Sequence, residues 1–110
     1  MDMDSLDFST MQRLQKQLQE KYRDKWGGLS PEKGRQTLLW LYGEAGEVGD
    51  IMKKQGDDKI LEDPQVRRHF VEEMCDILMY FNDLMLCYHI SPQELEEVYL
   101  QKHGTNMQRW

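Results

Sequence analysis

Apolar residues recur every three or four positions along most of the chain, which is the period of an amphipathic helix. The first such segment covers residues 8–25. Its apolar positions are Phe8, Met11, Leu14, Leu18 and Tyr22. Most of its other positions are Gln, Lys, Arg and Glu, so one narrow stripe is expected to pack and the rest to face water. Gly27 and Gly28 are expected to end this helix.

A second helix is predicted from Ser30 to about residue 55, with Ser30 as N-cap, Pro31 as its first residue and Gly56 as its stop. The polar segment 56–64 is expected to be a loop. A third helix is predicted over about 65–89.

The fourth helix is predicted to start at Ser91 and Pro92, because Ser91 and Glu94 have the spacing of a capping box. It is expected to end near Gly104. Strand-like alternation is scarce, so the pattern predicts an all-α fold. Residues 1–110 are expected to form a single domain with short mobile ends at 1–6 and 105–110.

The second helix carries two unusual stripes. Glu44 and Glu47 are three residues apart and therefore neighbours on the helix surface. Gly43, Gly46 and Gly49 also recur every third residue, although each glycine inside a helix costs about 1 kcal/mol relative to alanine. This pattern predicts that a neighbouring helix or a ligand approaches the backbone closely.

The third helix is apolar almost all round between Val71 and Ile90, so it is expected to be buried on most sides. Yet Glu73, Asp76 and Asp83 fall within one sector of its surface. Unpaired carboxylates beside so much apolar surface cost several kcal/mol each. Either this helix leaves one strip open to water, or its carboxylates share a cation.

An antiparallel hairpin of the two central helices would let both acidic pairs face each other. Glu44, Glu47, Glu73 and Asp76 would then supply four oxygen ligands, without His or Cys. Such a set suits Mg²⁺, with Mn²⁺ as a substitute, rather than zinc. A third acidic pair, Glu94-x-x-Glu97, is interpreted as a solvated helix start.

Composition narrows the class of protein further. The chain has 110 residues and a net charge of −6, whereas a nucleic-acid binder is usually basic. No apolar run approaches the roughly 18 residues that span a membrane, and the acidic start is unlike a signal peptide. Cys75 and Cys87 would lie roughly 18 Å apart on one helix, too far to pair. We therefore expect a cytoplasmic protein with reduced thiols.

Two segments resemble those of the MazG-like nucleotide pyrophosphohydrolases, members of the all-α NTP pyrophosphatase superfamily. They are residues 43–50, GEAGEVGD, and residues 72–80, EEMCDILMY. The pattern E-x-x-E followed by E-x-x-D is fairly specific in combination, and the resemblance covers roughly residues 8–110.

The resemblance implies a function and an assembly. The function is Mg²⁺-dependent hydrolysis of nucleoside triphosphates to monophosphate and pyrophosphate, in nucleotide-pool housecleaning. The four carboxylates would be the metal ligands, and Glu47 would also orient the attacking water. Lys102, Asn106 and Arg109 resemble the phosphate-contacting residues of the family. The central hairpin of a four- to five-helix subunit would form a four-helix bundle with a partner subunit, in a homodimer or homotetramer.

Each of the following residues could have one of two roles. Trp26 and Trp40 could stack on a nucleobase or serve as hydrophobic anchors. Lys54, beside Lys53, could reach phosphates or simply complement a helix C-terminus. Asp83 could be an accessory metal ligand, or it could support the metal ligands without binding the metal itself.

Two alternative functions stay open. Phosphoribosyl-ATP pyrophosphohydrolysis is the closest competitor within the enzyme class. Outside it, the chain could be a non-catalytic helical oligomerisation or nucleotide-binding module. The presence of all four carboxylates favours the enzyme.

Overall fold

The computed structural model describes residues 5–110, and every regular element in that range is helical. The elements are α1 (Phe8–Lys21), α2 (Arg23–Trp26), the 3-10 helix η1 (Pro31–Lys33), α3 (Gly34–Gln55), α4 (Asp57–Glu62), α5 (Pro64–Cys87) and α6 (Pro92–Arg109). The predicted all-α class is confirmed, with six α-helices among the described residues in place of four or five.

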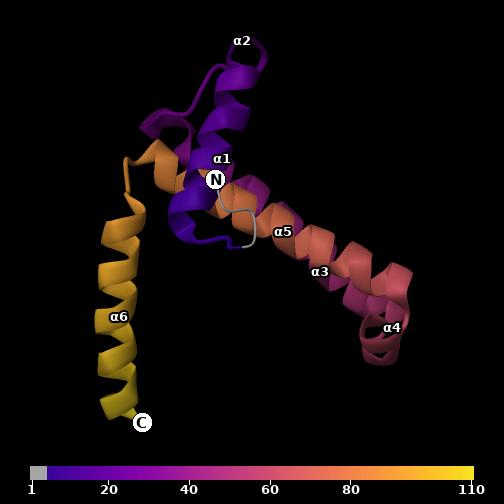
Figure 1. Cartoon of the computed structure of the whole chain (residues 1–110). Coiled ribbons are helices and arrows are strands. Elements are labelled where there is room, and N and C mark those ends of the chain that lie inside the picture. Colours follow the sequence, from indigo (N-terminus) through magenta and orange to yellow (C-terminus); the bar gives the residue numbers. More distant parts are fainter. Residues whose placement is uncertain (1–4) are drawn as a thin grey trace.

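The two long helices α3 and α5 lie side by side as an antiparallel hairpin (Figure 1). The short helix α4 closes one end of the hairpin, and α1 packs across α5 near the other end. Helix α6 projects away from the hairpin and packs against α1. The hairpin therefore holds both acidic motifs, while α6 stands apart from them.

The polarity of the segment between the long helices predicts a loop, but the segment contains the short helix α4. Gly56 ends α3 with a left-handed φ of 81°, and the next two residues, Asp57 and Asp58, occupy the first turn of α4. Acidic side chains favour that position because the N-terminal end of a helix carries partial positive charge. The Asp63 carboxylate then caps α5 by accepting hydrogen bonds from the backbone N–H groups of Gln65 (2.9 Å) and Val66 (3.3 Å).

The first predicted helix is interrupted. Helix α1 stops at Lys21, where Tyr22 leaves helical geometry (φ −108°, ψ 22°), and α2 continues to Trp26. The ring centroids of Tyr22 and Trp26 lie 4.7 Å apart. Gly27, with a φ of 83°, ends α2 as expected.

The fourth helix is longer than predicted. It starts at the Ser91 cap, whose hydroxyl accepts from the Glu94 N–H at 3.1 Å, but continues through Gly104 to Arg109. An interior glycine costs about 1 kcal/mol yet keeps the backbone hydrogen bonds. Residues 105–109, which the sequence predicts to follow this helix, are therefore part of it. In the expected mobile end at 1–6, residues 1–4 lie outside the described part of the chain.

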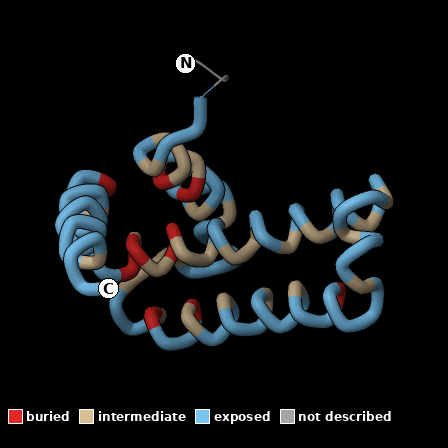
Figure 2. The backbone as a smooth tube through the Cα atoms, turned by 90° about the horizontal axis from the view of Figure 1, so that it is seen from below, coloured by how far each residue is buried: buried red, intermediate tan, exposed pale blue. Residues whose placement is uncertain are grey.

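Few residues of a single chain are buried (Figure 2), and more than half of the buried side chains described are polar. Among the described residues, the buried side chains are the apolar Ile51, Met85, Cys87 and Pro92 and the polar Gln12, Gln15, Thr37, Asn82 and Asp83. The predicted packing stripe of α1 is thus only partly right, because α1 buries two glutamines while Leu18 stays 38% exposed. Polar burial requires hydrogen-bond partners, and Gln12 donates to the Ile90 carbonyl at 2.8 Å.

Within one chain, α5 is not buried on most sides, contrary to the expectation from its apolar sequence. α3 covers one side and α1 covers only its C-terminal half, so Val71, Met74 and Leu78 remain exposed. Nor does anything lie within 4 Å of a methyl group built on Gly43, Gly46 or Gly49. The close approach predicted for these glycines is therefore absent within one chain.

Candidate metal centre

Three of the four predicted ligands converge between the two hairpin helices. One carboxylate oxygen each of Glu44 on α3 and of Glu73 and Asp76 on α5 lie within 4.8 Å of one another. Each residue is half-buried. Because the helices run antiparallel, the two motifs meet at the same level of the hairpin. This is the spacing at which carboxylates can share one cation.

The converging acids disturb one another electrostatically. Burial raises the pKa of Glu44, and a hydrogen bond with Glu73 and the negative charges of Asp76, Glu73 and Glu47 raise it further. Burial also raises the pKa of Asp76, with added contributions from Glu73 and Glu72. Every charged group that perturbs these two pKa values is acidic.

Glu47 lies outside the three-residue cluster, although its charge reaches Glu44. It is exposed and lines a smaller depression of about 270 Å³, together with Lys54 and His69. His69 places its Nε2 atom 3.3 Å from Glu73 Oε1. The sequence analysis assigned no role to this histidine. Its i, i+4 spacing from Glu73 was the signal that could have placed it beside the site.

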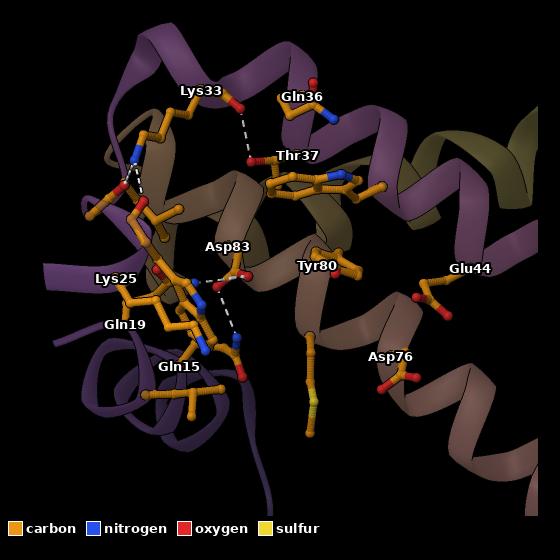
Figure 3. A pocket seen from close by; sticks show the side chains of 16 residues that line it. Gln15, Gln19, Lys25, Lys33, Gln36, Thr37, Glu44, Asp76, Tyr80 and Asp83 are labelled. Carbon is orange, nitrogen blue, oxygen red and sulfur yellow. Dashed lines mark hydrogen bonds between the residues drawn. The ribbon is translucent and has the colours of Figure 1, made fainter. Parts of the chain in front are cut away.

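A cavity of about 670 Å³ opens on the other side of the cluster (Figure 3). Glu44 and Asp76 form part of its wall, so the acidic cluster stands at its rim. Trp26 and Trp40, the two tryptophans considered as stacking partners for a nucleobase, both line the cavity. The ring centroids of Trp40 and Tyr80 lie 6.0 Å apart. The cavity therefore combines carboxylates at one end with aromatic and apolar walls.

Asp83 lies apart from Glu44 and Asp76 along the wall of this cavity, with Tyr80 between (Figure 3). Its side chain is buried, at 5% exposure. Two amides from α1 hold it, because Gln15 Nε2 donates to Oδ1 at 2.8 Å and Gln19 Nε2 donates to Oδ2 at 3.4 Å. Asp83 is therefore separate from the three converging acids.

Burial raises the pKa of Asp83 above its ordinary 3.8, and the hydrogen bonds from Gln15 and Gln19 offset part of that rise. A raised folded-state pKa gives a stabilising contribution that is complete below the unfolded pKa and is lost as the pH rises through the folded pKa. We therefore expect the free energy of unfolding of the wild type, compared with that of Asp83→Asn, to increase as the pH is lowered from about 7 to about 4. Urea denaturation of both proteins at each pH measures the difference. A difference that did not change with pH would contradict this expectation.

The three predicted phosphate-contacting residues are not brought to the cluster within one chain. Lys102, Asn106 and Arg109 lie on α6, which points away from the hairpin (Figure 1). The Arg109 guanidinium instead lies 5.1 Å from the centroid of the Trp110 ring. A contact between these residues and a nucleotide at the cluster would have to involve a second copy of the chain.

Comparisons with protein-family models, with curated proteins and with solved structures found no match. None of the helices between residues 5 and 110 combines the length and the apolar character that crossing a membrane requires. The site itself therefore carries the functional interpretation.

Proposed function

We propose that the chain is a Mg²⁺-dependent nucleoside triphosphate pyrophosphohydrolase, which converts (d)NTP to (d)NMP and pyrophosphate. One observation carries the proposal: Glu44, Glu73 and Asp76 converge at the rim of a cavity with aromatic walls. The two halves of a nucleotide need these two environments. Its phosphates need cations, which carboxylates can hold, and its base needs a flat apolar pocket.

The donor set fits a hard divalent cation. The three converging groups offer only carboxylate oxygens, and their mutual repulsion is the kind that a bound cation relieves. Mg²⁺ is usually held by a few carboxylates and shares its remaining positions with water and substrate phosphates. We assign Glu44, Glu73 and Asp76 as the holding residues, and a bound Mg²⁺ would supply Lewis-acid polarisation of the phosphate oxygens.

The remaining steps fall to side chains around the cluster. Glu47, close enough to Glu44 to raise its pKa, is the proposed group that orients the attacking water and accepts its proton. The water attacks the α-phosphorus, the bond from that phosphorus to the bridging oxygen breaks, and pyrophosphate leaves. Lys54, which lines the depression beside Glu47, is the proposed cationic partner of the leaving pyrophosphate.

The same proposal includes a partner subunit. A chain of 110 residues with four buried apolar side chains among those described has too little core to be stable alone. A second copy packed on the open face of α3 and α5 would bury the exposed apolar residues and approach the glycine stripe. We propose a homodimer or homotetramer built on a four-helix bundle. Two free cysteines, Cys75 and Cys87, fit a reducing compartment such as the cytoplasm.

The test is product analysis with the purified protein and the common ribo- and deoxyribonucleoside triphosphates. We expect pyrophosphate release that requires Mg²⁺, stops with a chelator and falls in a Glu47→Gln variant chiefly through kcat. Orthophosphate as the first product would mean that a different bond is cleaved. Turnover of phosphoribosyl-ATP alone would assign the competing enzyme activity, and turnover of no substrate would favour the non-catalytic module.

A further inference from the structure

The cavity beside the acidic cluster contains one buried acidic group that the proposed hydrolysis does not use. Asp83 is 5% exposed, lines the cavity and lies outside the three converging acids. Burying a carboxylate costs several kcal/mol unless it is well partnered. Its partners here are two neutral amides, so the cost is only partly offset. A group kept buried at this cost calls for a role in what the cavity binds.

The carboxylate of Asp83 accepts two hydrogen bonds and can accept at least one more. Gln15 and Gln19 each donate to one of its oxygens, and the second bond, at 3.4 Å, is weak. A carboxylate has about four lone-pair sites, so two donors leave room for a third partner. Asp83 lines the cavity together with the two glutamines that bond it, so a third partner could reach its carboxylate from the cavity (Figure 3).

The position of Asp83 along α5 indicates which part of a nucleotide it meets. It lies seven residues beyond Asp76, which is two helical turns or about 10 Å along the axis. With the α-phosphate at the cluster, a group that read the sugar hydroxyls would have to lie nearer to Asp76. The edge of the base is the part that reaches this far, and its faces would lie against apolar walls that include Trp26, Trp40 and Met79.

We infer that Asp83 contacts the edge of the nucleobase and selects bases that present an amino group there, namely cytosine and adenine, over uracil, thymine and hypoxanthine, which present a carbonyl oxygen at the same place. This inference rests on the proposed function for the placement of the phosphates. An acceptor-only carboxylate binds an amino group, whereas a carbonyl oxygen at the same place is repelled and leaves the buried acid unpaired. The apolar walls strengthen both the attraction and the repulsion.

Matched substrates test this selectivity. dCTP and dUTP differ only at one edge of the ring, as do ATP and ITP, which carries hypoxanthine and lacks the amino group. For the wild type, we expect kcat/KM to favour the amino-bearing member of each pair by about ten- to a hundredfold, the effect of one charge-assisted hydrogen bond. Asp83→Asn, which nearly preserves the shape, should reduce that ratio at least about tenfold while pyrophosphate remains the product. Glu97→Gln removes one exposed negative charge from α6 and should leave the ratio unchanged.

Binding of dCMP and dUMP, followed by tryptophan fluorescence, separates this inference from the proposed function because it needs no turnover. Tighter binding of dCMP that is lost in Asp83→Asn supports the role of Asp83 even if no triphosphate is hydrolysed. Equal binding of dCMP and dUMP by the wild type would overturn it, even if pyrophosphate is released normally. Preference for dUMP would also overturn it, because Asp83 would then act as a protonated donor. Asp83→Ser provides the second variant if the asparagine protein does not fold.

Discussion

Replacing Asp76 by asparagine is expected to lower Mg²⁺-dependent pyrophosphate release by roughly a hundredfold or more, because one of the three converging carboxylates is lost. The metal-free variant should nevertheless resist urea better than the wild type. Burial and the charges of Glu73 and Glu72 raise the pKa of Asp76 above its ordinary 3.8. The contribution of such a group is favourable below its unfolded pKa and is lost as the pH rises through the folded pKa. Near neutral pH the ionised carboxylate therefore destabilises the fold, and the neutral amide removes that cost.

Glu97→Gln is the matched control for this experiment, since Glu97 is an exposed acid in an E-x-x-E pair that lies outside the cluster. It should change neither activity nor stability. Added Mg²⁺ should raise the unfolding midpoint of the wild type, because it binds only the folded protein, and should raise that of Asp76→Asn much less. A loss of activity accompanied by a loss of metal-free stability would instead assign Asp76 a structural role.

Leu39→Asp is expected to weaken self-association by roughly a hundredfold or more. Leu39 lies on α3 at 60% exposure, on the same helix face as Tyr42, which is also 60% exposed. Burying a leucine contributes about 1.5–3 kcal/mol, and a two-fold interface contains each such residue twice. Losing both copies shifts a dissociation constant by two orders of magnitude or more. Sedimentation velocity over a range of protein concentrations measures the change.

Leu6→Asp is the control for the assembly experiment, because Leu6 is equally exposed but precedes the first helix. The Leu6→Asp variant should sediment in the same way as the wild type. If Leu39→Asp sedimented like the wild type, the open face of α3 would not be the interface. A wild type that is monomeric and stable at all concentrations would remove the need for a partner altogether.

The hairpin and its acidic cluster could be predicted from sequence because they depend on local spacing. Glu44 and Glu73 each belong to a motif with helical period, and antiparallel helices of this length must bring the two motifs to one level. Glu47 shows the limit of that reasoning. Two residues three apart share a helix face only broadly, about 60° apart in rotation, so one can face the neighbouring helix while the other remains in solvent.

The parts that sequence did not predict depend on tertiary contacts or on weak local signals. Gln12 and Gln15 are buried because acceptors on distant segments, the Ile90 carbonyl and the Asp83 carboxylate, receive their hydrogen bonds. No periodicity in α1 could reveal those partners. Helix α4 lies in a polar segment, and polarity alone indicates a loop, although its acidic first turn suits a helix N-terminus. The extension of α6 past Gly104 reflects a small penalty that intact backbone hydrogen bonds outweigh.

The crowding of Glu44, Glu73 and Asp76 also bears on how this chain would evolve. Acids that repel one another destabilise the metal-free protein. Mutation of one of them to an amide therefore increases stability and decreases catalytic activity. Selection for heat resistance alone would therefore be expected to erase the cluster early, whereas selection for turnover would retain it and accumulate compensating changes elsewhere. Among descendants of this sequence, the amino acids at these three positions would distinguish lineages that kept the activity from those that kept only the scaffold.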